Sequence, residues 1–440
     1  MVFPVTACGK DRAEEIGTAW GAETIPAADT IESTQETAAV PDSEAGGPEE
    51  ETIIRVEFDL ENKTVILNSG YEMPVNGLGT YSLHGDECIA SVKSALSNGV
   101  RLIDTASAYG NEEEVGQAIR EAVSEGIIQR EDVFVTTKIY PGSEMENPNQ
   151  SIQDCIDRLD IGYVDYYLLH NVNGMRYQQV IRDTHMFDYL KKWKEEGKIR
   201  HIAFSFHDSA DVLDRILTEH PEVEAVQIAL NYIDRNAYFV QAKACYEVIR
   251  KHGRQVIIME PVKGGMLAKV PEEAEKLMEA ENPGASAASW AIRYAAELDG
   301  VLAVLSGMST LDQVKDNVSF MKEFQPLNER EKDILKQTVR IFRESGPAGT
   351  PDFTKYEKIS PRGISVAAIL DCYNNCMLQP VPTFGAEHNY FSSEKAKHGL
   401  HKEDLCIPGD VILEDGTDAT ELVHKAEEFL GESAFFQYEF

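Results

Sequence analysis

The chain has 440 residues, 42% of them hydrophobic, so it can hold one large domain with extensions. Its formal net charge of −34 argues against nucleic acid or an anionic membrane surface as a partner, and no apolar run approaches the length of a membrane-spanning helix. The seven cysteines are scattered, odd in number and lack a C-x-x-C pair. We therefore expect buried thiols, with neither a disulfide framework nor a metal site.

Residues 1–56 form the first predicted segment. Residues 9–52 are rich in Glu, Ala, Thr, Pro and Gly, and they cannot bury enough apolar surface to fold, so we expect a disordered acidic linker. Val5-Thr-Ala-Cys8 resembles the end of a bacterial lipoprotein signal, although the basic start and apolar stretch of such a signal are missing. Two expectations follow: a cytoplasmic protein as the sequence is written, or an extracytoplasmic lipoprotein anchored at Cys8 if the true start lies upstream.

Residues 57–327 are predicted to form one α/β domain. It opens with a β-hairpin over 63–73 that turns at Asn68-Ser-Gly70. Eight strand-like runs then alternate with amphipathic helices, which indicates a parallel sheet and favours a closed (β/α)8 TIM barrel. The alternative is an open doubly wound sheet, but no G-x-G-x-x-G motif follows the first strand. The predicted strands are Val75–Gly79, Leu102–Asp104, Val133–Lys138, Tyr166–His170, Ile199–Phe204, Ala225–Leu230, Val256–Glu260 and Val301–Leu305.

Eight amphipathic helices are predicted between and after these strands. They are Glu87–Asn98, Glu112–Glu125, Ser151–Leu159, Phe187–Glu196, Ala210–Glu219, Val240–His252, Ala285–Glu297 and Leu311–Phe324. Residues 328–440 are predicted to form a separate tail that is helical over Glu329–Ser345, Ile364–Met377 and Thr420–Leu430 and irregular elsewhere.

Four residues near the ends of successive predicted strands carry the chemical information. Asp104, Lys138 and His170 each end an apolar run, and Tyr109 follows the first of these runs in a short loop. Asp104 and Lys138 are 34 residues apart, and Lys138 and His170 are 32 apart, about one strand-helix-strand step each time. Equivalent ends of parallel strands meet on one rim of a barrel, where catalytic residues of this architecture lie. We therefore expect these four side chains to form one site.

These four side chains are together suited to reducing a carbonyl group, because the developing alkoxide needs a proton and a positive field. Tyr109 can donate the proton, Lys138 can lower the pKa of the phenol, and Asp104 can hold the lysine charged and in place. A neutral His170 can orient the carbonyl oxygen. Taken singly, each residue is more often a surface ion pair, a turn residue or a core polar group. Their combination at matching strand ends favours the catalytic interpretation.

Five segments resemble the aldo/keto reductase family, in the order that the family has them. They are Gly77–Tyr81 (GLGTY), Arg101–Ala106 (RLIDTA), Tyr109–Gly116 (YGNEEEVG), Val164–His170 (VDYYLLH) and Gly197–Ser205 (GKIRHIAFS). The resemblance covers about residues 63–325. It implies a (β/α)8 barrel that binds NADP(H) across the carboxyl ends of the strands and reduces a small aldehyde or ketone to an alcohol.

The resemblance also implies which residues bind the cofactor. Ser205 and Gln227, in the fifth and sixth strands, correspond to residues that bind the nicotinamide carboxamide. The loop and helix start that correspond to the adenosine-binding segment contain Gly307, Ser309, Thr310, Gln313 and Asn317. Hydroxyl and N–H groups at a helix start suit a phosphate, although an ordinary N-cap would look the same. The family usually has a basic residue in this loop for the 2′-phosphate, but Met308 and Gln313 supply no charge here, so NADP(H) is expected ahead of NAD(H) on the family resemblance alone.

The segment Glu260-Pro-Val-Lys-Gly-Gly265 resembles a bacterial subgroup of the family that carries a ferredoxin-like C-terminal tail. The resemblance implies that Glu260, Lys263 and Gly264 contribute to the cofactor site, with Lys263 near the pyrophosphate.

The tail itself departs from that subgroup in its cysteines. An iron–sulfur cluster needs four thiolates, closely spaced. Here Ser360 stands where a cysteine is expected, Cys372 and Cys376 form a lone pair, and Cys406 has no neighbour. We therefore expect a degenerate ferredoxin-like tail and no iron–sulfur cluster.

Two other functions remain open alongside the carbonyl reductase. One is a non-catalytic cofactor-binding or sensor protein on the same barrel, against which the intact set of four residues argues. The other is a lipid-anchored protein that acts on sugars or other solutes with a bound, slowly exchanged cofactor.

Overall fold

The structure is a computed structural model that describes residues 76–322, 324–350, 352–359, 364–378 and 407–431, together with the backbone of 57–59, 64–66 and 72–74. These residues belong to one compact unit, 54–440. The predicted acidic linker over 1–56, with Cys8, lies outside the described residues, as do Ser360 and Cys406.

Eight parallel strands close into a barrel in the order β10-β11-β4-β5-β6-β7-β8-β9. This confirms the predicted (β/α)8 fold and excludes the open sheet. Each strand end lies within two residues of its predicted position, because strands buried on both faces read as continuous apolar runs. The strands are β4 Asn76–Gly79, β5 Leu102–Asp104, β6 Phe134–Ile139, β7 Val164–Val172, β8 Ile199–Phe206, β9 Ala225–Ala229, β10 Gln255–Met259 and β11 Val301–Ser306.

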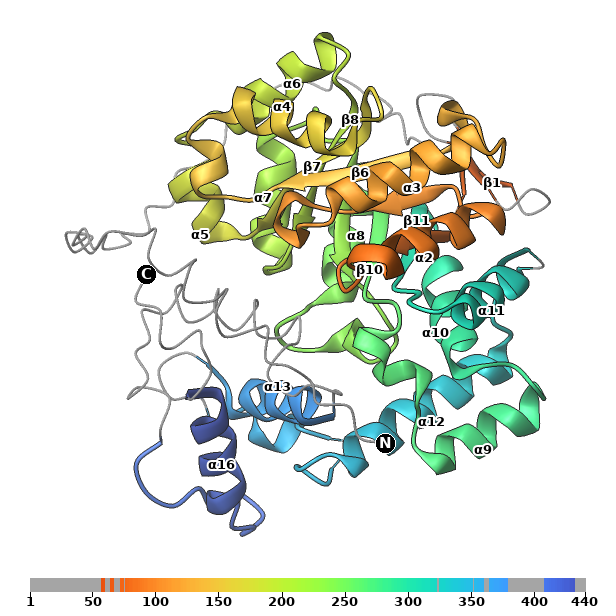
Figure 1. Cartoon of the computed structure of the whole chain (residues 1–440). Helices are drawn as coiled ribbons and strands as arrows, with labels where there is room; N and C mark the ends of the chain where they lie inside the picture. The colour runs from red at the N-terminus through yellow and green to blue at the C-terminus, as the bar shows by residue number, and fades with distance from the viewer. Residues whose placement is uncertain are drawn as a thin grey trace, which may run out of the picture. The chain divides into compact units, whose positions relative to one another are not determined.

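Helices lie outside the strands and pack their apolar faces onto the barrel (Figure 1). All eight predicted helices are present, with ends within three residues of the prediction. They are α2 Gly85–Ser97, α3 Glu112–Ser124, α4 Pro148–Leu159, α6 Met186–Glu195, α7 Ala210–Glu219, α8 Ala242–Lys251, α10 Ala287–Ala296 and α11 Leu311–Lys322.

Several shorter or less regular elements were not predicted. Helix α9 (Glu272–Glu281) was missed because its run of glutamates leaves a weak apolar periodicity. The single turn α5 (Gly174–Arg176) and the π-helix η4 (Tyr177–Ile181) follow β7. The remaining short turns are η1 Ser107–Tyr109, η2 Arg130–Asp132, η3 Ser143–Met145, η5 Asp234–Asn236, η6 Lys263–Ala268 and η7 Thr354–Tyr356.

Helices α3 and α4 approach each other closely at Gly116. A Cβ atom at this position would lie 1.9 Å from the carbonyl oxygen of Leu159, so only glycine fits without moving the backbone. Helix α4 begins with Pro148 in its first turn, where the missing N–H is not needed. This packing holds the first turn of α3 beside β6, and both elements border the candidate site.

The predicted hairpin before the barrel is present and is extended by one strand. β2 (Thr64–Ile66) pairs antiparallel with β3 (Glu72–Pro74), as expected. β1 (Glu57–Asp59), which was not predicted, pairs antiparallel with β2 and completes a three-stranded sheet.

The described part of the tail is helical and contacts the barrel domain. Helices α12 (Glu329–Ser345) and α9 pack together, as do α13 (Val366–Leu378) and α16 (Thr420–Gly431) (Figure 1). The backbone N–H of Tyr238, in the connection before α8, donates to Asp371 of α13 over 3.3 Å, and the hydroxyl group of Tyr238 donates to Glu357 over 2.5 Å. The tail therefore packs on the connection that follows β9.

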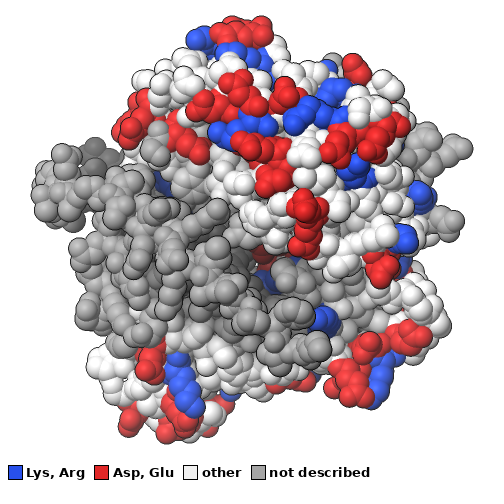
Figure 2. All heavy atoms as spheres, viewed as in Figure 1, with Lys and Arg blue, Asp and Glu red and all other residues white. Residues whose placement is uncertain are grey.

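Basic side chains are interspersed among acidic ones on the face that Figure 2 shows. No helix among the described residues is long and apolar enough to cross a bilayer. The five described cysteines, 88, 155, 245, 372 and 376, are buried, as expected.

Candidate active site

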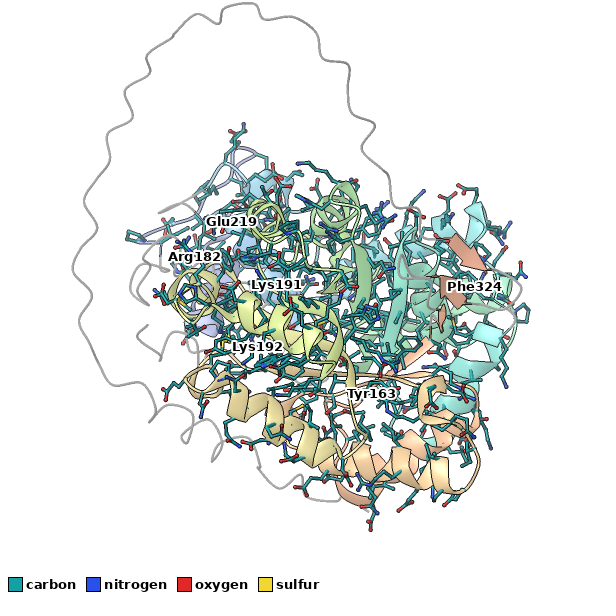
Figure 3. The ribbon with its side chains drawn as sticks, turned by 90° about the horizontal axis from the view of Figure 1, so that it is seen from above. Tyr163, Arg182, Lys191, Lys192, Glu219 and Phe324 are labelled. Atoms are coloured by element: carbon teal, nitrogen blue, oxygen red, sulfur yellow. The ribbon has the colours of Figure 1, made fainter. Side chains whose placement is uncertain are left out.

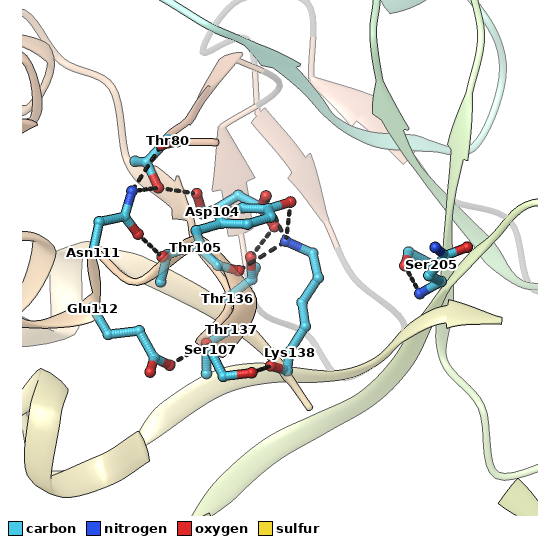
Figure 4. A network of polar contacts seen from close by, with 12 residues as sticks. Thr80, Asp104, Thr105, Ser107, Asn111, Glu112, Thr136, Thr137, Lys138 and Ser205 are labelled. Atoms are coloured by element: carbon cyan, nitrogen blue, oxygen red, sulfur yellow. Dashed lines mark hydrogen bonds and ion pairs between the residues drawn. The ribbon is translucent and has the colours of Figure 1, made fainter. Parts of the chain in front are cut away.

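The four predicted catalytic residues lie together at the carboxyl ends of β5, β6 and β7. The ammonium group of Lys138 is 2.7 Å from Asp104 Oδ2, 2.8 Å from the carbonyl oxygen of Thr105 and 3.3 Å from the hydroxyl oxygen of Tyr109 (Figure 4). The rings of Tyr109 and His170 meet edge to face, with centroids 5.7 Å apart. A buried lysine thus contacts a carboxylate and a phenol, and an imidazole packs against the same phenol.

A network of threonine and asparagine side chains fixes Asp104 and the loop that carries Tyr109. The hydroxyl group of Thr136 donates to Asp104 Oδ1. The hydroxyl group of Thr105 donates to Asn111 Oδ1 over 2.6 Å, and the amide of Asn111 donates over 2.8 Å to the carbonyl oxygen of Thr80 (Figure 4). These residues are buried, so the bonds are shielded from water and hold the loop firmly.

Glu112, in the first turn of α3, forms a second buried cluster behind Lys138. Its carboxylate accepts a hydrogen bond of 2.5 Å from Thr137 and one of 2.7 Å from Arg158. Sequence reasoning missed both this cluster and the threonine and asparagine network, although the segment Tyr109–Gly116 had been singled out as a motif.

The phenol of Tyr109 is a weaker acid in this structure than the sequence suggested. Burial raises its pKa well above the ordinary value, and the negative charges of Asp104 and Glu260 add to the rise. Burial also lowers the pKa of Lys138, against the opposing effect of Asp104. The rise reflects desolvation of the phenol and its acidic neighbours, and the predicted effect of Lys138, which would favour the phenolate and so lower the pKa of Tyr109, stays a prediction.

The surroundings of His170 favour its neutral form. Burial and the positive charges of Lys138 and Arg176 hold the pKa of His170 well below its usual range. The Nδ1 atom of His170 is buried and has no hydrogen-bond partner within the described part of the chain. Burial and Arg176 also lower the pKa of the neighbouring His207, to about 3.

Three side chains at the ends of β7, β8 and β9 fit an amide ligand. The amide oxygen of Gln227 is buried, and so is that of Asn171; neither has a hydrogen-bond partner among the described residues. The hydroxyl oxygen of Ser205 accepts a hydrogen bond of 2.8 Å from the backbone N–H of Asn171. Buried acceptors without donors are costly, so this cradle fits a group with N–H donors such as a carboxamide. Asn171 was missed in the sequence, where only its position next to His170 could have indicated it.

The five residues predicted for the adenosine end lie around the start of α11. Gln313 accepts hydrogen bonds from the backbone N–H groups of Ser309 (2.8 Å) and Thr310 (3.2 Å). The N–H of Gln313 donates to the hydroxyl oxygen of Thr310 over 3.2 Å, which makes a reciprocal helix cap. Asn317 is buried and donates to Ser306 over 2.7 Å, and Gly307 precedes the cap. These residues satisfy one another here, and their cofactor contacts stay predictions.

The loop after β10 holds a second buried lysine. The ammonium group of Lys263 is 2.6 Å from Asp234 Oδ1, and both side chains are fully buried. The amide of Asn231 donates to Asp234 over 2.7 Å and to the carbonyl oxygen of Glu260 over 3.1 Å. Glu260, Lys263 and Gly264 all have positive φ angles. Lys263 thus forms an ion pair within the protein, and its predicted contact with a pyrophosphate stays a prediction.

A separate groove lies on the outside of the barrel, among η4, α6 and the end of α7. Arg182, Lys191, Lys192 and Glu219, which Figure 3 labels, belong to this region of the surface. The groove contains none of the predicted site residues. Its lining residues are Tyr177, Ile181, Arg182, Asp183, His185, Met186, Phe187, Asp188, Glu219 and His220.

A model of the aldo/keto reductase family matches residues 76–340, which include the whole barrel and the four residues at its rim. The chain belongs to the aldo/keto reductase family. An aldo-keto reductase from Mycobacterium avium is 32% identical over 256 residues, which are 58% of this chain and 83% of that protein. An NADP-dependent D-sorbitol-6-phosphate dehydrogenase from Malus domestica is 26% identical and covers 65% of this chain and 97% of its own.

Among solved structures, an aldo/keto reductase from Brucella melitensis superposes with a TM-score of 0.51 at 27% identity, over 62% of this chain and 98% of that one. The family match confirms the predicted oxidoreductase and its barrel. It ends at residue 340, so it does not test the origin of the tail of this aldo/keto reductase.

Proposed function

We propose that the protein reduces an aldehyde or ketone to an alcohol with NAD(P)H, with Tyr109 as the general acid. The observation that carries the proposal is the ammonium group of Lys138, which lies 2.7 Å from Asp104 and 3.3 Å from the hydroxyl oxygen of Tyr109. A lysine held in this way is ready to stabilise the phenolate that remains after Tyr109 has given up its proton.

The raised pKa of Tyr109 is compatible with this role. It keeps the phenol protonated at neutral pH, so that a proton is always present for donation. An alkoxide is far more basic than a phenolate, so the transfer is downhill even from a phenol of raised pKa. His170, which is neutral, can donate one hydrogen bond to the carbonyl oxygen and keep it in line with Tyr109.

The bound cofactor supplies the hydride, and residues of the barrel rim would hold it. Ser205, Gln227 and Asn171 offer buried polar atoms to the carboxamide of a nicotinamide. The helix start at Ser309 and Thr310 offers hydroxyl and N–H groups to a phosphate. Preference for NADP(H) over NAD(H) is part of the proposal, and the relative from Malus domestica, which is named as NADP-dependent, supports it. A 2′-phosphate would then be bound without a basic residue from this loop.

We also infer that the tail is a degenerate ferredoxin-like segment that carries no iron–sulfur cluster. Its support is that Cys372 and Cys376 lie one turn apart on α13, both buried, where they offer two thiols and not four closely spaced ones. Iron and acid-labile sulfide in the protein purified without oxygen test this inference, and four irons per chain would contradict it.

Turnover and binding, measured on the same preparation, test the main proposal. Oxidation of NADPH and NADH is followed at 340 nm with a panel of aldehydes and ketones, and cofactor binding is followed by quenching of tryptophan fluorescence. We expect binding and steady turnover, with NADPH preferred. Tight binding of either cofactor without turnover of any carbonyl compound would instead favour a non-catalytic cofactor-binding protein on the same barrel.

A further inference from the structure

Arg176 lies at the end of the short turn α5, directly after β7. Its guanidinium group donates two hydrogen bonds of 3.1 Å, one to the carbonyl oxygen of Asn171 and one to the hydroxyl oxygen of Tyr140. A guanidinium group has five N–H donors, so three remain after these two bonds. Arg176 is only partly exposed, and its spare donors are therefore held close to the protein surface.

Arg176 forms no ion pair with a carboxylate among the described residues. Some other arginines of the barrel are paired with a carboxylate; Arg158 contacts Glu112 at 2.6 Å and Arg293 contacts Glu331 at 2.7 Å. The positive charge of Arg176 is therefore not neutralised locally.

The segment that carries Arg176 is held firmly. Asn173 caps the turn by accepting a hydrogen bond of 2.9 Å from the backbone N–H of Arg176. The nearby carboxylate of Asp208 is occupied by backbone groups; it accepts bonds of 2.8 Å from Gly174 and 2.7 Å from Ser209. The guanidinium group is thus positioned before any ligand arrives, which reduces the entropy lost on binding.

Tyr140 connects Arg176 to the catalytic residues. The guanidinium carbon of Arg176 lies 5.5 Å from the centroid of the Tyr140 ring, and the ring centroid of His170 lies 5.4 Å from that of Tyr140. The backbone N–H of Tyr140 donates to Glu144 over 2.8 Å, and the hydroxyl of Ser107, two residues before Tyr109, donates to the same carboxylate oxygen over 2.8 Å. Arg176 therefore lies one side chain beyond His170.

Different charged side chains lie near Tyr109 and near His170, the two residues that would contact the carbonyl oxygen. On the side of Tyr109 lie Asp104, which is paired with Lys138, and Glu260. On the side of His170 lies Arg176. The carboxylate of Glu144 is also near, but it accepts hydrogen bonds from Tyr140 and Ser107 and forms no ion pair with Arg176.

We infer that Arg176 and Tyr140 form an anion subsite, and that the enzyme acts on carbonyl compounds that carry a carboxylate or phosphate group a few atoms from the carbonyl carbon. This inference rests on the proposed reduction. The carbonyl carbon receives the hydride of NAD(P)H, the oxygen receives the proton of Tyr109, and the anionic end contacts Arg176 and the hydroxyl group of Tyr140. Planar guanidinium groups suit both kinds of anion, because two N–H groups can bind two oxygens at once.

Matched pairs of aldehydes test the subsite. Succinic semialdehyde is compared with butanal, and glyceraldehyde 3-phosphate with glyceraldehyde, in the wild type and in Arg176→Gln, with kcat and KM measured separately. We expect kcat/KM for the anionic member of at least one pair to exceed that of the neutral member on the order of 10- to 100-fold. Arg176→Gln should remove this preference, mainly through KM, and Arg176→Lys should restore part of it. The two pairs distinguish a carboxylate from a phosphate.

Arg182→Gln is the matched control, because Arg182 is an exposed arginine six residues further along the same connection. It should leave both the preference and the neutral activity unchanged. Calorimetric binding of 4-hydroxybutyrate and of glycerol 3-phosphate, which are products of the two anionic aldehydes, gives a readout that does not depend on turnover. Equal binding by the wild type and Arg176→Gln, or an equal loss of kcat/KM for anionic and neutral aldehydes in Arg176→Gln, overturns the subsite. Anion binding that depends on Arg176 without turnover of any aldehyde supports the subsite and contradicts the proposed function instead.

Discussion

Two buried lysine–aspartate pairs lie at the rim of the same barrel. Lys138, in β6, is 2.7 Å from Asp104, and Lys263, in the loop after β10, is 2.6 Å from Asp234. Both lysines are almost inaccessible, with side chains 1% and 0% exposed. In residue type, burial and separation of charge the two pairs are nearly the same.

The difference lies in what else each pair contacts. Lys138 also reaches the hydroxyl group of Tyr109, a group that can give up a proton. Asp234 is instead bonded to Asn231, which in turn holds the backbone of the loop at Glu260. A buried lysine–aspartate pair at a barrel rim is therefore not catalytic by itself. Its role depends on a third group that contacts it: Tyr109 can exchange a proton next to Lys138, whereas Asn231 links Asp234 to the backbone of a loop.

Lys138→Met should give the largest combined effect. It removes the ammonium group beside Tyr109, and we expect kcat/KM to fall by a factor on the order of 10² or more. It also leaves Asp104 buried without its partner, which should lower the free energy of unfolding by roughly 3–5 kcal/mol. Steady-state kinetics and urea unfolding followed by tryptophan fluorescence measure the two losses. Unchanged kcat/KM in a folded Lys138→Met protein would contradict the role of the lysine.

Lys263→Met is the matched change in the second pair. It should also lower the free energy of unfolding by roughly 3–5 kcal/mol, because the buried carboxylate of Asp234 loses its ammonium partner. Since Lys263 does not contact Tyr109, kcat of the folded fraction should change by no more than about threefold. KM for the cofactor is the diagnostic measurement. A rise in the KM of NADPH of tenfold or more, without loss of stability, would show that Lys263 binds the cofactor and does not only hold its loop.

The contrast between the pairs also shows what the sequence could reveal. Asp104, Lys138 and His170 end apolar runs, and the barrel topology alone brings such ends together, so their meeting was predictable. Asp234 and Lys263 are 29 residues apart, and their contact depends on the positive φ angle of Lys263, which no pattern indicates.

Two further features of the site could not be read from the sequence, for different reasons. The contact of Arg176 with Tyr140 depends on the turn α5 and the π-helix that follows it, and these elements have no clear periodicity. The rise in the pKa of Tyr109 depends on how deeply the phenol is buried, which spacing does not encode. Residue types and topology thus located the site, while loop conformation and solvation set its charges.

Tyr109→Phe tests the role of the hydroxyl group that Lys138 contacts. It removes one hydroxyl group and leaves both charges of the pair in place, so the free energy of unfolding should change by no more than about 1 kcal/mol. In contrast, kcat/KM should fall by a factor on the order of 10² or more, because no proton donor remains beside the alkoxide. Tyr81→Phe is the control: Tyr81 is 71% exposed, and its ring contacts that of Tyr109 edge to face. Equal rates for the wild type and Tyr109→Phe would refute the assignment of the acid.

The pH dependence should give the smallest effect, and it leaves both lysine–aspartate pairs charged, so it tests the imidazole beside them. The pKa of His170 is held well below its usual value, so kcat/KM should show no inflection near pH 6.5 and should vary by less than about twofold between pH 6 and 7.5.

Below pH about 6.5 the unfolded chain binds a proton at His170 that the folded protein does not bind. The free energy of unfolding should therefore decrease as the pH falls, by about 1 kcal/mol from His170 between pH 7 and 5.5. The measurement is urea unfolding of the wild type and of His170→Gln at both pH values, since their difference isolates this residue. The same pH slope in both proteins, or a rate inflection near pH 6.5 that His170→Gln abolishes, would mean that His170 becomes protonated in the working pH range. Lys138 would then not be the only positive charge beside Tyr109.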